Sequence, residues 1–249
     1  MAGHSKWANI KHRKARQDAV KGKAWSKCSR AIIVAAKSGG GDPNANLALR
    51  YAIDEARAAN MPKDTIEKAI KKGSGDLESG ESYTEIRYEG YGAGGVAILI
   101  DCLTDNVNRT APEMRKIFEK AGGNMAKPGA VAFGFNKRGL IAISAEHATE
   151  DQVMEIALEN GADDVSLADG IWEILTEPSN FIGVREAIEA ASIPTESASI
   201  TMIPTTTVSC DATTAAKVLR LIDILEEHDD TQQVYHNAEM SDDVLAALE

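Results

Sequence analysis

The sequence has 249 residues, 43% of them apolar, which is enough to bury hydrophobic cores and excludes general disorder. Its three cysteines stand far apart, with no Cys-x-x-Cys pair and no dense His/Cys cluster, so neither a zinc site nor a disulfide framework is expected. The longest apolar run, around residues 96–100, is far too short to cross a bilayer, and the first thirty residues contain no signal-peptide pattern. We therefore expect a cytoplasmic protein without a membrane partner.

Charge is divided unevenly along the chain, whose formal net charge is −11. Residues 1–72 hold 16 Lys and Arg against 6 Asp and Glu, a net of +10, while the remainder holds 11 against 32, a net of −21. Such asymmetry indicates an interaction segment. We expect two surfaces with different partners, nucleic acid for the basic part and a protein for the acidic part.

The basic part begins with an arm and continues in a helix. Residues 3–21 are dense in Lys and Arg and lack a convincing apolar stripe, so we expect this arm to be helical at most in part. Residues 23–37 have helical periodicity, with apolar side chains on one side and cations on the other. Trp25 falls on the apolar side and is expected in a core. Val34 falls among the lysines, so that face is expected to contact another element in part.

Two shorter helices are expected next. The first covers residues 46–59 and has Asp42 or Asn44 as its cap. The second has Pro62 in its first turn and ends at Gly73. With the preceding helix they make a small bundle.

A stretch of Gly, Ser and acidic residues, 74–82, marks a domain boundary, because the composition changes there from basic to acidic. Beyond it the pattern predicts two strands, a helix and a third strand, at residues 83–91, 95–103, 107–121 and 131–135. A helix at 212–228 and a strand at 232–235 are expected to complete this middle domain.

The residues between these parts follow the order β-α-β-β-α-β, which is the ferredoxin-like arrangement. The predicted elements are strand 140–144, helix 150–160, a hairpin of strands 164–167 and 171–176 across Asp169-Gly170, helix 180–191 and strand 196–203. The fold class is thus α+β, with an N-terminal helical bundle followed by two α+β domains, the second inserted within the first. The predicted domains are 1–80, 81–137 with 204–240, and 138–203.

Two motifs have competing interpretations. Gly90, Gly92 and Gly95 have the Gly-x-Gly-x-x-Gly spacing of dinucleotide sites, but an apolar, β-rich run follows them instead of a helix N-terminus, which favours a glycine-rich hairpin or bulge. Polar residues in 104–108 can cap the helix that begins there. Capping alone and an anion or RNA-backbone contact through Arg109 both stay open.

Five ordered blocks resemble the signature of the YebC/PmpR family over essentially the whole chain. They are AGHSKWANIKHRKARQD at 2–18, NMPKD at 60–64, YEGYGAGGVA at 88–97, LTDNVNRT at 103–110 and DTQQVYHN at 230–237. The resemblance implies a helical N-terminal domain, two α+β domains and a transcriptional regulator. It also implies a translational role, since relatives include a mitochondrial translational activator. Ala93 and Ala130 depart from the usual Pro and Ser, which affects only a local turn and a hydroxyl contact.

We predict a regulator of gene expression that binds DNA through its basic N-terminal region, because Lys and Arg attract phosphates and release counterions. The alternative is a ribosome-associated translation factor that binds ribosomal RNA or tRNA. Stacking of Trp7 on an unpaired base and packing of Trp7 against the bundle both stay open. The candidate nucleic-acid-binding residues are Lys6, Trp7, Lys11, His12, Arg13, Lys14, Arg16, Lys21, Lys23, Lys27, Arg30 and Arg109.

The sequence contains no nucleophile elbow, no His-Glu-x-x-His motif, no P-loop and no assembled acid/base set. We therefore predict no catalytic residue, no metal and no cofactor, and expect a protein that is not an enzyme. Two other classes stay open: an enzyme whose residues meet only on folding, and an adaptor that binds proteins through its acidic domains. Loss of nucleic-acid binding on neutralising the arm would separate the binding protein from both.

Overall fold

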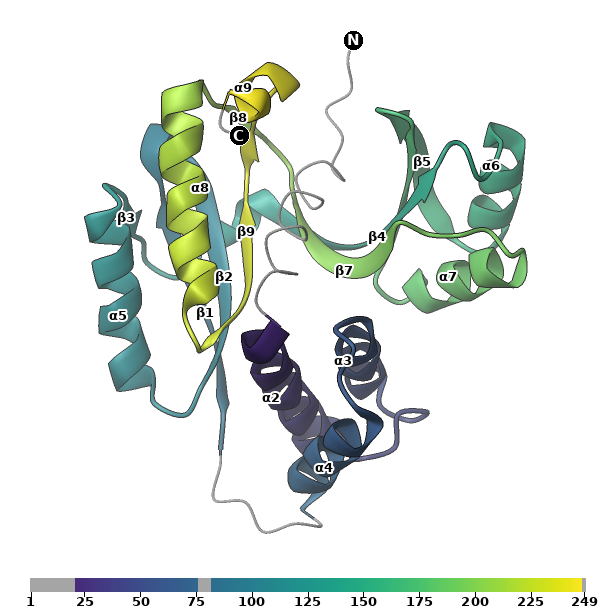
Figure 1. Ribbon diagram of the computed structural model, residues 1–249, viewed down its shortest axis with the longest axis horizontal. Coiled ribbons are helices and arrows are strands. Elements are labelled where there is room, and N and C mark those ends of the chain that lie inside the picture. The colour runs from purple at the N-terminus through teal and green to yellow at the C-terminus, as the bar shows by residue number, and fades with distance from the viewer. Residues whose placement is uncertain (1–20, 76–81, 248–249) are drawn as a thin grey trace. The chain divides into compact units, whose positions relative to one another are not determined.

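The computed structural model describes residues 21–75 and 82–247 (Figure 1). These residues divide between two compact units, one of which takes in residues 133–209 and 239–247 and the other the rest. None of the described helices is long and apolar enough to cross a membrane.

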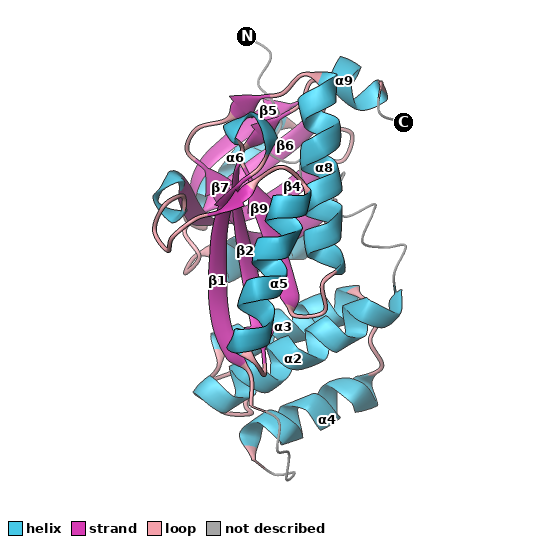
Figure 2. Cartoon of the chain, turned by 90° about the vertical axis from the view of Figure 1, so that its left-hand side faces the viewer, coloured by secondary structure: helices cyan, strands magenta, loops and turns pink. Residues whose placement is uncertain are grey.

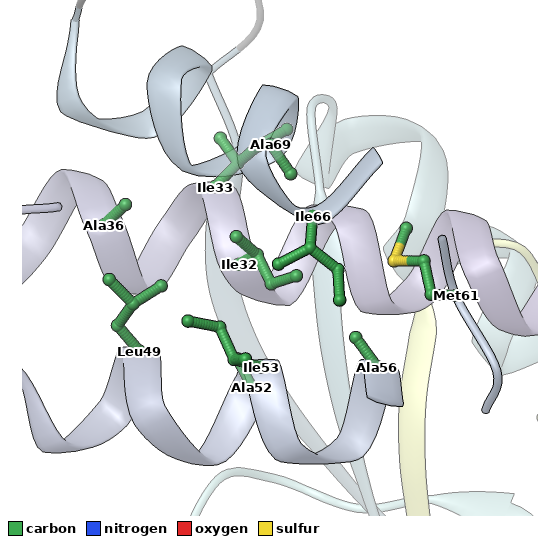
Figure 3. Packing of buried hydrophobic residues seen from close by; sticks show 10 residues of the cluster. All are labelled: Ile32, Ile33, Ala36, Leu49, Ala52, Ile53, Ala56, Met61, Ile66 and Ala69. Atoms are coloured by element: carbon green, nitrogen blue, oxygen red, sulfur yellow. The ribbon is translucent and has the colours of Figure 1, made fainter. Parts of the chain in front are cut away.

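Three helices open the larger unit: α2 (Lys21–Gly39), α3 (Leu47–Ala58) and α4 (Lys63–Ser74). Helix α2 packs against both of the others. Apolar side chains at helical spacing meet between them, as Figure 3 shows. The core residues are Ile32, Ile33, Ala36, Leu49, Ala52, Ile53, Ala56, Met61, Ile66 and Ala69. The predicted small bundle is confirmed.

The end of α4 differs from the prediction. Gly73 lies inside the helix, where an added Cβ would stand 2.4 Å from the backbone oxygen of Ile33 in α2. A glycine is needed here because it lets the two helix backbones approach closely. The helix continues to Ser74 and ends at Gly75, whose φ of +87° is the left-handed conformation of a C-cap. Pro62 stands at the N-cap and not inside the first turn.

The start of α3 also differs. Its N-cap is Asn46, and neither Asp42 nor Asn44 has this role. The Asn46 side chain accepts a hydrogen bond from Leu49 N at 3.1 Å and donates to two carbonyls of the preceding segment. Asp42 instead accepts from the backbone N–H of Asn44 at 2.9 Å, which shapes the turn before the helix.

Trp25 is not a core residue, contrary to the prediction. Its side chain is 37% exposed, and its indole N–H donates to the carbonyl of Ala59 at 3.0 Å. An indole N–H requires a partner, and the carbonyl that supplies it lies at the C-cap of α3, at the edge of the bundle. Val34 is buried, as expected for a face that other elements cover in part.

The larger unit also contains a four-stranded antiparallel sheet in the order β3-β1-β2-β9. Helices α5 and α8 lie side by side on one face of it (Figure 2). Fully buried side chains of both helices, such as Phe118 and Val218, fill the layer between them and the sheet. The elements are β1 (Thr84–Tyr91), β2 (Ala97–Thr104), α5 (Val107–Lys120), β3 (Asn124–Met125), α8 (Ala212–Glu227) and β9 (Thr231–His236).

The third strand was predicted at the wrong place. Residues Ala132–Gly134 form a 3-10 turn, η2, and the strand is Asn124–Met125. The backbone N–H groups that a strand at 131–135 would offer to a neighbour point instead to the buried carboxylate of Glu89. The three donors are Gly129 at 2.6 Å, Val131 at 2.7 Å and Ala132 at 2.9 Å.

The glycine-rich segment is a hairpin connection, as predicted. Strands β1 and β2 pair antiparallel without interruption from Thr84 opposite Thr104 to Tyr91 opposite Ala97. A 3-10 turn, η1 (Ala93–Gly95), joins them and contains two glycines with φ of 69° and 78°. Positive φ explains the glycines, and no helix begins there to receive a pyrophosphate.

The other unit has the predicted ferredoxin-like order, β-α-β-β-α-β, in an antiparallel sheet ordered β5-β6-β4-β7. Strand β4 begins at Phe135, five residues before the expected start. Asp169 and Gly170 have φ of 52° and 75°, as a two-residue hairpin turn requires. The elements are β4 (Phe135–Ser144), α6 (Glu150–Glu159), β5 (Ala162–Ala168), β6 (Ile171–Thr176), α7 (Phe181–Ala190) and β7 (Ser197–Pro204).

The α+β class with an inserted ferredoxin-like unit is confirmed. Because the helices and the middle sheet share one compact unit, the limits of the three predicted domains stay a prediction. The sequence did not predict three short elements, which are β8 (Val208–Ser209), β10 (Ala238–Glu239) and α9 (Asp242–Ala246).

Candidate nucleic-acid interface

Most of the predicted binding residues belong to the arm. Lys6, Trp7, Lys11, His12, Arg13, Lys14 and Arg16 lie outside the described residues. Lys21 and Lys23 lie at the start of α2. The remaining three, Lys27, Arg30 and Arg109, all reach the end of α8 and the turn that follows it, residues 226–230.

The cations of α2 contact backbone carbonyls at that turn. Lys27 Nζ donates to the carbonyl of Glu226 at 2.7 Å. Arg30 Nη1 donates to the carbonyl of Asp229 and lies 3.5 Å from the carboxylate of Asp230. The last carbonyls of a helix lack intrahelical partners and carry the negative end of its dipole, so they attract cations. The cationic side of α2 is thereby joined to the end of α8.

Asp230 is the centre of this contact, and only 3% of it is exposed. Its Oδ2 accepts hydrogen bonds from Arg109 Nη2 and Thr110 Oγ1, each at 2.8 Å. Burial by itself raises the pKa of Asp230, but hydrogen bonds from Arg109, Thr110 and Thr104 outweigh it and hold the pKa below its usual value. Asp230 is therefore ionised at neutral pH.

Arg109 has two roles at the start of α5. Its backbone N–H donates to the N-cap side chain of Asn106 at 3.2 Å, which confirms the capping interpretation. Its side chain is not free, because Nη2 also donates to Asp105 at 2.9 Å. The hydrogen bond to Asp230 raises the pKa of Arg109 further. A guanidinium has five N–H donors, and the three on Nε and Nη1 have no hydrogen bond within the described part of the chain.

A groove of about 850 Å³ lies beside this cluster. Helix α5 forms one side of it, and the α8–β9 turn forms another. Arg30 lies over the ring of Tyr83, 5.7 Å from its centre, and both residues line the groove. The lining residues are Arg30, Tyr83, Asp105, Arg109, Glu113, Lys116, Ile117, Lys120, Ile224, Glu227, His228, Asp229 and Asp230.

Sequence reasoning missed Lys116 and Lys120. The available signal was their spacing from Arg109 within a predicted helix, because positions i, i+7 and i+11 fall on one face. Glutamates at 113 and 119 concealed this pattern by making the helix look evenly charged. Only the fold shows that this face lines a groove next to α2.

No catalytic or metal chemistry stands out in the described part of the chain, where no group of three His, Cys, Asp or Glu side chains could hold a metal ion. Burial raises the pKa of the Cys28 thiol to about 11 and that of the Cys102 thiol to about 12. Both thiols are protonated at neutral pH and are poor nucleophiles. His228 Nδ1 accepts from the backbone N–H of Asp230, so Nε2 carries the proton that it shares with Glu113 at 3.0 Å.

Two family models match the chain. Residues 5–76 match the TACO1/YebC protein N-terminal domain, and residues 83–238 match the TACO1/YebC second and third domain. The chain is 55% identical over 249 residues to a probable transcriptional regulatory protein of Methylococcus capsulatus and 51% identical over 250 residues to one of Idiomarina loihiensis. Each of these alignments covers 100% of both proteins.

A solved structure has the same fold. The crystal structure of a conserved hypothetical protein from Aquifex aeolicus matches with a TM-score of 0.81 and 46% sequence identity. The match covers 96% of this chain and 98% of that one.

Proposed function

Since the chain belongs to the TACO1/YebC family, we propose that it is a regulator of gene expression that binds DNA through its basic N-terminal region. Full-length relatives named probable transcriptional regulatory proteins support this role. We further propose that it acts in the cytoplasm and has no catalytic activity of its own.

The charge distribution carries the proposal. Residues 1–72 have a net charge of +10 in a chain whose remainder has −21. Within residues 1–37, ten Lys and Arg stand against one acid, Asp18. A cationic segment of this density neutralises phosphates and releases the counterions condensed on them, so binding becomes strongly dependent on salt.

The salt dependence of binding tests the proposal. Lys11, Arg13, Lys14 and Arg16 are changed together to Ala, and the binding constant for a duplex DNA of 20 base pairs is measured over a range of salt concentrations. Each lost phosphate contact lowers the slope of log K against log salt by ~0.9, so the slope should fall by roughly three units. Affinity should fall almost equally for all sequences, because phosphate contacts carry no direct base information.

A matched control removes four exposed cations from the acidic part of the chain, Lys127, Lys137, Lys217 and Arg220. This variant should keep the wild-type slope. An unchanged slope in the arm variant would move the nucleic-acid surface away from the arm. Stronger binding of ribosomal RNA or tRNA than of duplex DNA at matched salt would replace the transcriptional role with a ribosome-associated one.

A further inference from the structure

We propose that the groove along α5 is a second phosphate-binding surface, on which Lys116, Lys120 and the outer edge of Arg109 contact the sugar-phosphate backbone of a bound nucleic acid. This inference rests on the proposed function and adds a site outside the N-terminal region.

The first argument is geometric. Arg109, Lys116 and Lys120 stand at positions i, i+7 and i+11 of one helix, which places them within about 40° around its axis. All three line the same groove. At 1.5 Å per residue the row is about 16 Å long. One strand of B-DNA rises 3.4 Å per nucleotide, so the row matches about five successive phosphates.

The second argument is the availability of charge. Lys27 and Arg30 already contact the end of α8, and Asp230 occupies one nitrogen of Arg109. Lys116 and Lys120 are exposed and have no ion-pair partner among the residues that the structure describes. Arg109 retains three unused N–H donors, and its side chain is 44% exposed. The cations that can meet a phosphate here therefore belong to α5.

Acidic side chains also line the groove and limit where a backbone can lie. Asp105 and Asp230 are paired with Arg109, and Glu113 faces His228. Glu227 and Asp229 belong to the end of α8 and the turn after it. Their charge repels phosphates, so it confines the backbone to the α5 side of the groove. Tyr83, Ile117 and Ile224 provide apolar surface in the groove for the sugars.

The position of Arg30 links the groove to the basic region. Arg30 lines the groove and belongs to α2, the helix that follows the arm in sequence. A strand held by the cations before α2 can thus continue past Arg30 onto α5. Both DNA and RNA offer this backbone, so the shared ligand chemistry is the phosphodiester.

The test is the double variant Lys116→Ala/Lys120→Ala in the full chain. Binding of a 20-base-pair duplex DNA and of a 20-nucleotide single-stranded RNA is measured between 50 and 200 mM salt. The slope of log K against log salt should fall by about 1.8 for the duplex and about 1.4 for the single strand. Over this fourfold range of salt the wild-type protein should lose about twelvefold more duplex affinity than the variant.

The control is Lys217→Ala/Arg220→Ala, which removes the same charge from exposed positions of α8 that do not line the groove. It should keep the wild-type slope. Both variants should keep the wild-type melting temperature, because all four side chains are exposed. A photo-crosslinking amino acid in place of Lys120 should form an adduct with the bound probe, and one in place of Lys217 should not.

A wild-type slope for Lys116→Ala/Lys120→Ala would overturn the groove as a binding surface, as would equal effects of the two variants. The arm variant described above would still flatten the slope in both cases, so the proposed function would survive. A wild-type protein that binds neither probe would overturn both proposals.

Discussion

Asp230 shows how one buried carboxylate can occupy cations that the sequence assigns to another partner. It lies within hydrogen-bonding distance of Arg30 from α2 and Arg109 from α5, and it also accepts from Thr110. Removing one member of a buried, charged hydrogen-bond network leaves the others desolvated without compensation. Asp230 is therefore a residue on which the stability of the larger unit depends.

Asp230→Asn should lower the free energy of unfolding by about 2 to 3 kcal/mol, because hydrogen bonds to a charged group are each worth about 1.5 to 3 kcal/mol. Urea denaturation followed by circular dichroism measures the change. Asp105→Asn is the matched control, since it removes a carboxylate from the same arginine at a 58%-exposed position. Its effect should stay within about 1 kcal/mol. Equal losses in the two variants would contradict the role given to burial.

Glu89 should make stability depend on acid. Burial raises its pKa, but hydrogen bonds from the backbone of Val131, Gly129 and Ala132 outweigh this and lower the pKa below 4.5. A depressed pKa in the folded state contributes stability above the unfolded value, and that stability is lost as pH falls through the folded pKa. The free energy of unfolding should thus decline below about pH 4.5, and Glu89→Gln should reduce the decline.

Glu89→Gln should also cost about 2 kcal/mol at neutral pH, because charge-assisted hydrogen bonds become neutral ones. Denaturation curves at several pH values measure both effects. Glu85→Gln is a control at an exposed position of the same strand. A wild-type decline with acid in the Glu89 variant would show that another carboxylate is responsible.

Neither carboxylate could be recognised from the sequence. Glu89 and Asp230 stand in acidic stretches where most carboxylates are solvated, and no local pattern marks them as buried. The cations were found because charge density is visible in sequence. Their partners were not, because burial is a property of the folded chain.

Asn46 connects two helices. It caps α3, and its amide donates to the carbonyls of Ala35 and Gly40, each at 2.8 Å. Asn46→Ala should cost about 3 kcal/mol, since it removes an N-cap and leaves two carbonyls without donors. Thermal denaturation measures the loss. Asn44→Ala, two residues away and exposed, should change stability by less than about 0.5 kcal/mol. A comparable loss for Asn44 would restore it as the cap.

Elements with a clear hydrophobic period were predicted well, because one buried face fixes that period. The long helices and the ferredoxin-like order are examples. Elements without such a face were missed. Strand β3 has two residues, and the segment at 131–135 is apolar yet folds around Glu89. A pattern of side chains does not show where backbone N–H groups find their acceptors.

Nearly all the excess negative charge of the molecule belongs to the inserted unit. Residues 138–203 contain 2 Arg, no Lys and 13 Asp and Glu, a net of −11, which equals the net charge of the whole chain. The remaining residues are therefore balanced in sum. This distribution places the predicted protein-binding surface on the inserted unit and keeps that unit away from phosphates.

Residues 133–209 should fold when expressed alone, because their sheet is complete and their helices pack against it. Dispersed amide-proton signals would show this. A fragment limited to 138–203 should be less stable, since it loses the pairing of Phe135, Asn136 and Lys137 with β7. An unfolded longer fragment would show that the unit needs the rest of the chain. Neither fragment should bind the duplex probe.

The insertion itself was predictable, because strands and helices left over on both sides of a complete β-α-β-β-α-β pattern had to form one domain. The contact between α2 and the α8–β9 turn was not. Lys27 and Glu226 are 199 residues apart, and no local feature of either segment indicates the other.

This separation has a consequence for synthesis. A ribosome adds about 5 to 20 residues per second, so roughly 10 to 40 s pass between the emergence of Lys27 and that of its acceptor. During this time α2, α3 and α4 can bury their own core, and the inserted unit can fold completely. Strand β2 must wait for β9 with one edge unpaired. The last part of the chain to leave the ribosome therefore closes the sheet and neutralises the first described helix in a single step.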